Sequence, residues 1–137
     1  MGKSMGLLAA SAASLFAVVT LSGCVDPGTS FAVFDREAVS TDAFPSDLPD
    51  YADDELVPAS SRFVGEYDGD TLYLAQGKKG EICLLIDPED SVDWSLGCGG
   101  GTSINAGGPR GEYFVRPDSG TPPEGSVRIS DNVYAAE

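Results

Sequence analysis

The chain has 137 residues, with 22 acidic residues against eight lysines and arginines and no histidine, and its net charge is −14. That length allows one small domain. An acidic excess of this size argues against nucleic-acid binding, which needs a basic patch. The absence of histidine removes the commonest general base, a frequent zinc ligand and every Ser-His or Cys-His nucleophile pair. We therefore expect no enzymatic activity, no cofactor, no metal and no nucleic-acid partner.

Residues 1–23 have the layout of a secretory signal peptide. One charge, Lys3, precedes an uncharged and largely apolar run over residues 5–21. A transmembrane anchor is the alternative, but it needs about 20 apolar residues. This run is shorter and is interrupted by Ser11, Ser14 and Thr20. The pattern predicts an exported protein.

The run ends in Leu21-Ser22-Gly23-Cys24. This tetrapeptide resembles the lipobox of bacterial lipoproteins. The resemblance implies a diacylglyceryl group on the thiol of Cys24 and signal-peptide cleavage between Gly23 and Cys24. A disulfide through Cys24 is the alternative, but the other two cysteines can pair with each other and leave Cys24 alone.

Lipidation would place the protein on the extracytoplasmic face of the cell membrane. Two acyl chains hold a protein stably, whereas one is marginal. The mature chain, residues 24–137, has seven basic and 22 acidic residues and a net charge of −15. An anionic membrane surface should repel such a body.

Residues 24–60 form an acidic segment rich in Pro and Ser. Five acids fall within residues 47–55, and neither a helical nor a strand period persists. Such a sequence predicts a largely irregular tether, spanning roughly 30–35 Å if fully flexible. Its apolar residues suggest at most partial docking on the following domain, as a strand at residues 30–34 or a turn at 45–48. An acidic segment that binds a basic partner is the alternative.

Residues 61–137 read as a mainly β, small antiparallel β-sheet domain of about six short strands. Alternating apolar positions predict strands near residues 62–67, 71–76, 81–87, 94–98 and 112–116, with one or two more over 126–134. Residues 68–70 are a turn signal, and residues 77–80 form a short hairpin connection. The third strand is apolar on both faces, so we expect it to be central. The glycine-rich stretch 97–108 is expected to be a flexible loop.

Cys83 and Cys98 are predicted to form a disulfide. An exported chain meets a compartment that permits disulfides, and a domain of this size needs such a bond to supplement its core. A redox pair or free thiols are the alternatives. The two cysteines are 15 positions apart, so they are not a CxxC motif.

Signals for a reactive site are few. Asp87, Glu89, Asp90 and Asp93 could bind calcium weakly, but they lack the register of an EF-hand, and a solvated acidic loop is the simpler interpretation. Paired carboxylates can hydrolyse glycans, although no motif marks a pair here. Trp94 is expected to be a core residue rather than a platform for sugars.

The body also resembles small uncharacterised lipoproteins and secreted proteins of high-GC Gram-positive bacteria, a group that implies export and no particular activity. The shared residues are Phe34-Asp35-Arg36, Ser61-Arg62, Gly69, Tyr73-Leu74-Ala75, Cys83-Leu84 and Cys98. We therefore predict a lipid-anchored cell-envelope protein acting as a binding or structural module with an envelope protein partner. An inhibitor or accessory subunit of an envelope complex is one alternative. A wall or glycan hydrolase that uses carboxylates is the other.

Overall fold

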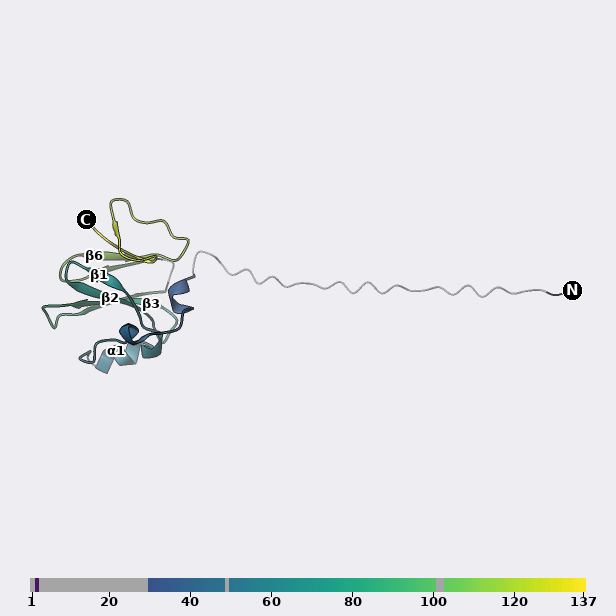
Figure 1. Cartoon of the computed structure of the whole chain (residues 1–137), viewed down its shortest axis with the longest axis horizontal. Coiled ribbons are helices and arrows are strands. Elements are labelled where there is room, and N and C mark those ends of the chain that lie inside the picture. Colours follow the sequence, from purple (N-terminus) through teal and green to yellow (C-terminus); the bar gives the residue numbers. More distant parts are fainter. Residues whose placement is uncertain (1, 3–29, 49, 101–102) are drawn as a thin grey trace.

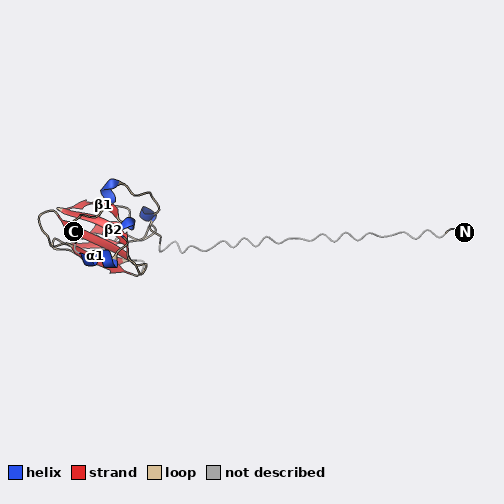
Figure 2. Ribbon diagram, turned by 90° about the horizontal axis from the view of Figure 1, so that it is seen from below, coloured by secondary structure: helices blue, strands red, loops and turns tan. Residues whose placement is uncertain are grey.

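Two four-stranded antiparallel sheets make up the folded part of the computed structural model, which describes residues 2, 30–48, 50–100 and 103–137. The first sheet has the order β1-β2-β3-β4 and the second β5-β6-β8-β7. The mainly β prediction is confirmed, with eight strands in place of about six. Figures 1 and 2 show the strands filling the body, with the helical segments outside them. The strands are β1 (Arg62–Tyr67), β2 (Asp70–Gln76), β3 (Ile82–Pro88), β4 (Ser95–Gly99), β5 (Ile104–Gly107), β6 (Glu112–Val115), β7 (Val127–Arg128) and β8 (Val133–Ala135).

Local turn chemistry sets the order of the first sheet. Asp68 and Gly69 both have positive φ angles, 49° and 82°, and they join β1 to β2 in a tight hairpin. The Gly77–Gly80 connection then joins β2 to β3. β3 pairs with β2 on one side and β4 on the other, so the predicted central strand is confirmed.

The main core lies between the two sheets. Leu72 and Leu74 of β2 and Leu84 and Ile86 of β3 point to one side of the first sheet, as the period of two along a strand requires. They form one cluster with buried side chains of β5, β6 and β8, namely Ile104, Ala106, Tyr113, Val115, Val133 and Ala135. The two sheets therefore pack face to face.

The later part of the segment before β1, from Phe44 on, covers the other face of the first sheet (Figure 1). Its start packs against the main core instead, through Phe31, Val33 and Phe34. The segment contains three short 3-10 helices, η2 (Ala32–Phe34), η3 (Ser40–Asp42) and η4 (Pro58–Ser60), and one short helix, α1 (Asp50–Glu55). Leu56, just after α1, is fully buried in a second cluster with Ala75 and Cys83. This docking is more extensive than the sequence suggests, because four buried residues (Phe31, Asp42, Ala52 and Leu56) are spread along it.

Ser30, at the start of the described segment, is already docked. The backbone carbonyl of Ser30 accepts a 2.9 Å hydrogen bond from the Asp118 N–H. The Asp118 carboxylate accepts bonds from the Ser30 hydroxyl (3.2 Å) and the Ala32 N–H (2.8 Å). The expected strand at residues 30–34 is wrong, because η2 occupies this stretch, whereas the turn at residues 45–48 is present.

The glycine-rich stretch 97–108 was expected to be a flexible loop, and for its described residues that expectation is largely wrong. β4 and β5 occupy much of it. A Cβ atom on Gly97 would lie 2.7 Å from the Ala106 Cβ, and one on Gly99 would lie 2.9 Å from the Ile104 Cγ1. These glycines therefore allow the close approach of two strands from different sheets.

Candidate functional site

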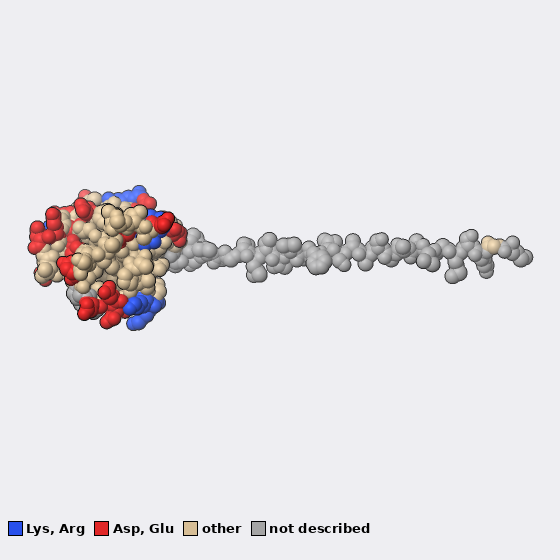
Figure 3. Space-filling view, turned by 60° about the horizontal axis from the view of Figure 1, so that its bottom comes forward, with Lys and Arg blue, Asp and Glu red and all other residues tan. Residues whose placement is uncertain are grey.

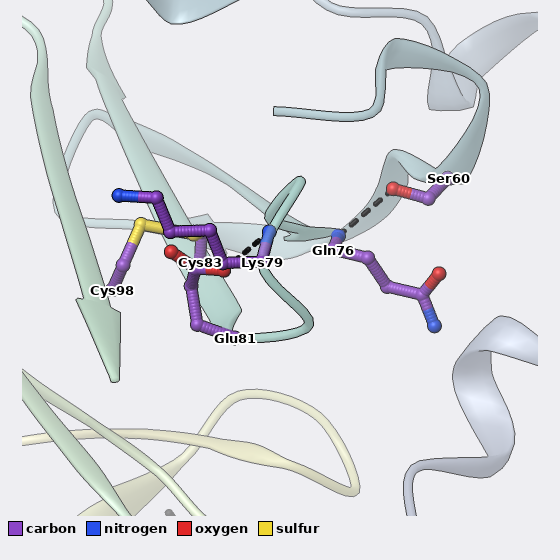
Figure 4. The surroundings of a disulfide bond; sticks show 6 residues. All are labelled: Ser60, Gln76, Lys79, Glu81, Cys83 and Cys98. Atoms are coloured by element: carbon purple, nitrogen blue, oxygen red, sulfur yellow. Dashed lines mark hydrogen bonds between the residues drawn. A yellow bond between two sulfur atoms is a disulfide. The ribbon is translucent and has the colours of Figure 1, made fainter. Parts of the chain in front are cut away.

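The predicted disulfide is present (Figure 4). Cys83 and Cys98 face each other as register partners on β3 and β4, with an S–S distance of 2.08 Å. Cys83 is completely buried beside Leu56 and Ala75, whereas Cys98 is exposed. The bond therefore ties the central strand β3 to the edge strand β4.

The predicted lipidation site, Cys24, lies outside the described residues, as does Gly23 at the predicted cleavage position. Within the part of the chain that is described, no helix is long and apolar enough to cross a membrane.

The acidic residues 87–93 do not converge on one point. Asp87 lies near the end of β3, on the face turned away from the main core. Burial raises the pKa of its carboxyl above the ordinary value, and the nearby charges of Asp47 and Asp70 add to this. Asp90 lies in the following turn and forms a 3.0 Å ion pair with Arg110. Among the described residues, no group of three or more acidic or cysteine side chains is placed to hold a metal ion.

A buried carboxylate, Asp70, lies at one end of the main core, and sequence reasoning missed it because residues 68–70 look like an ordinary turn. Asp70 is 0% exposed, and its Oδ2 accepts a 2.6 Å hydrogen bond from the Tyr113 hydroxyl of the second sheet. Its Oδ1 has no hydrogen-bond partner and lies 3.8 Å from the Arg110 Nε. Arg110 also donates to the Asp68 carbonyl at 2.7 Å.

Asp70, Tyr113 and Arg110 form what we call the Asp70 network, in which the Tyr113 hydroxyl acts as a hydrogen-bond donor. Burial, followed by the hydrogen bond to Asp70, raises the pKa of the Tyr113 hydroxyl above its ordinary value. The hydroxyl therefore stays protonated at neutral pH and acts as a donor. Arg110 extends from the β5–β6 connection to the turns at Asp68 and Asp90. The network joins the two sheets by polar contacts at this end.

A second buried carboxylate, Asp42 in η3, organises the docked segment. Arg36 donates two hydrogen bonds to it, at 2.6 and 2.7 Å, and the backbone N–H groups of Val39 and Phe63 each donate one at 2.8 Å. The Arg36 bonds lower the pKa of Asp42 well below its ordinary value, against the opposing effect of burial, and the two N–H donors add to this.

The same cluster joins two of the short sequences that carry the resemblance to secreted proteins. The Ser61 hydroxyl donates to the Asp42 carbonyl, and Arg62 donates to the Arg36 carbonyl at 2.9 Å. Arg36 and Ser61-Arg62 thus meet around Asp42 although they are 25 positions apart in sequence. Their role in this structure is to fix the segment onto β1.

Two surface cavities lie at opposite ends of β2. One, of about 430 Å³, is lined by residues 66–71 and Glu89, including Glu66, Asp68 and Asp70. The other, of about 520 Å³, is lined by Phe31, residues 79–82, Gly99 and Gly100. Trp94 lines neither of these two cavities. In the face shown in Figure 3, Asp and Glu atoms predominate at one end of the body.

Comparison of the chain with protein-family models, with curated proteins and with solved structures found no match.

Proposed function

We propose that this protein is exported, lipidated on Cys24 and held at the extracytoplasmic face of the cell membrane, where its β domain acts as a binding or structural module. The Cys83–Cys98 disulfide is the observation that carries this proposal. It uses two of the three cysteines and is a bond typical of exported proteins. Cys24, at the end of Leu21-Ser22-Gly23-Cys24, is the thiol left for a lipid.

The described surface favours a polar mode of binding. Its exposed large hydrophobic side chains are Val39, Val57 and Val92, which belong to separate segments. An inhibitor or accessory subunit that docks by an apolar patch would need several hundred Å² of such surface. We therefore place the binding activity in charged and polar groups. The acidic end of the body, which carries Glu66, Asp68 and Glu89, is the part that a basic envelope protein would contact.

The intact mass of the membrane-bound protein tests the lipid anchor. The full chain is produced in a lipidating Gram-positive host beside a Cys24→Ala variant and a Cys83→Ala/Cys98→Ala variant. We expect a mass equal to residues 24–137 plus a diacylglyceryl group for the wild type, and loss of that group only in Cys24→Ala. An unlipidated wild-type product released to the medium would contradict the anchor.

A further inference from the structure

The described part of the body includes Ser30, which is close in sequence to the predicted lipid on Cys24. Ser30 is held by Asp118 through three hydrogen bonds that involve Ser30 and Ala32. Only residues 25–29 separate Ser30 from Cys24. Whatever their conformation, six chain steps reach at most about 22 Å. The covalent link is therefore much shorter than a tether of residues 24–60 would be.

The end of the body next to Ser30 carries the lysines. Phe31 and Lys79 line the same cavity. Lys78 and Lys79 are exposed in the turn that follows β2, and they are the only lysines of the mature chain. Neither forms an ion pair within the described residues. Glu55 and Glu81 lie nearby, since the Glu55 carbonyl and the Glu81 carboxylate accept bonds from the backbone N–H groups of Lys78 and Lys79.

The opposite end of the body is strongly acidic. Glu66, Asp68 and Glu89 surround the cavity at the start of β2, one strand length from the lysine turn. Seven strand residues span about 20 Å, and the Debye length at physiological salt is about 8 Å. Charges at the acidic end are therefore screened from a surface that touches the lysine end.

We infer that the tether end of the domain, formed by Ser30, Phe31 and the Lys78–Lys79 turn, lies against anionic lipid headgroups of the membrane that anchors the protein. This inference rests on the lipid anchor proposed above. The short link brings this end to the bilayer. Its two lysines, which lie beside Glu55 and Glu81, make it less acidic than the far end. The uneven distribution of charge over the body then orients it: Glu66, Asp68 and Glu89 are directed away from the membrane, toward partners in the envelope.

Amine labelling tests this arrangement, because the mature chain holds only two lysines. The lipidated product, residues 24–137, carries Glu89→Lys as an internal reference at the far end. It is placed in detergent, in neutral phosphatidylcholine vesicles, and in vesicles that also contain phosphatidylglycerol. A water-soluble acylating reagent is added, and peptide masses give the labelling rate at each lysine. The labelling rates of Lys78 and Lys79 are each divided by the rate at position 89. We expect this relative rate to be about fivefold lower on the anionic vesicles than in detergent, which is the effect of about one lysine–headgroup contact.

A variant with a longer link is the matched control. Twenty Gly and Ser residues inserted between Pro27 and Gly28 add roughly 25 Å of average reach, and we expect them to remove most of the protection. Equal relative labelling in detergent and on anionic vesicles, for a protein whose mass confirms the lipid, would overturn the inference and leave the anchor intact. Equal protection with the long link would also overturn it. A product without lipid would instead refute the proposed function.

Discussion

The hydroxyl oxygen of Tyr113 lies 2.6 Å from Oδ2 of Asp70, and these two residues belong to different sheets. Both side chains are buried, and the rings of Tyr113 and Tyr67 pack edge to face beside them, with centroids 6.4 Å apart. The contact is a polar bond between the layers within an otherwise apolar core. Because the Asp70 side chain is fully buried, the hydrogen bond from Tyr113 and the charge of Arg110 must offset the loss of hydration of its carboxylate.

Tyr113→Phe should destabilise the domain by about 2 kcal/mol. The substitution keeps the ring packing and removes one donor from a buried carboxylate, which leaves an acceptor unsatisfied. The midpoint of urea unfolding, followed by tyrosine and tryptophan fluorescence at pH 7, measures the loss.

Tyr134→Phe is the matched control. Tyr134 is also buried, but its hydroxyl donates only a long 3.4 Å bond to the Asp131 carbonyl. We expect a change of less than about 0.5 kcal/mol, in line with a weak neutral bond. Equal losses for the two tyrosines would show that the Asp70 bond contributes nothing particular.

Asp42 gives the domain a dependence on acid. Its pKa is lower in the folded protein than in the unfolded chain, because Arg36 and two backbone N–H groups stabilise the charged form. Such a group contributes stability that is fully present above the unfolded pKa, about 3.9 for Asp. That contribution is lost as the pH falls from there toward the folded pKa. Wild-type stability should therefore decline as the pH drops below about 4.

Asp42→Asn should cost about 3 kcal/mol at pH 7, because Arg36 loses its partner and two N–H groups lose a charged acceptor. The variant should also lose part of the acid dependence, so that the gap to wild type narrows between pH 4 and pH 2. Urea unfolding at several pH values measures both effects. Asp53→Asn, on the exposed side of α1, is the control, and we expect it to change stability by less than about 0.5 kcal/mol. A gap that stays constant with pH would contradict the role given to Asp42.

The sequence predicts the first sheet well, because its determinants are local. The Asp68-Gly69 turn, the Gly77–Gly80 connection and the alternation along β3 each lie within a few residues of the strands they define. The disulfide follows from counting cysteines and from the predicted, untested export of the chain. These features require no knowledge of which distant segments meet.

The two buried carboxylates could not be predicted in the same way. Asp42 and Asp70 lie among many acids of similar local sequence, and only tertiary contacts bury them. The partner of Asp70, Tyr113, is 43 positions away, and Phe63, which donates to Asp42, is 21 positions away. An arginine close in sequence, such as Arg36 six residues before Asp42, was the one available hint.

The glycine-rich stretch was misinterpreted for a related reason. Glycine in a row suggests a loop, yet Gly97 belongs to β4 and faces Ala106 of β5. The absence of a side chain serves the contact between two strands, which becomes visible only once both strands are placed. A glycine with negative φ and open space around it tolerates a methyl group, whereas a glycine at such a contact does not.

Gly97→Ala should therefore destabilise the domain by about 1–3 kcal/mol, since its Cβ would approach the Ala106 Cβ to 2.7 Å and force the strands apart. Gly107→Ala, in β5 with nothing within 4 Å of its Cβ position, should change stability by less than about 0.5 kcal/mol. The double variant Gly97→Ala/Ala106→Gly transfers the methyl group across the contact and should recover much of the loss. Thermal unfolding of wild type, Gly97→Ala, Ala106→Gly and the double variant measures the cycle, with Gly107→Ala as the control. Additive losses in the double variant would mean that Gly97 is required for its backbone and not for the space it leaves.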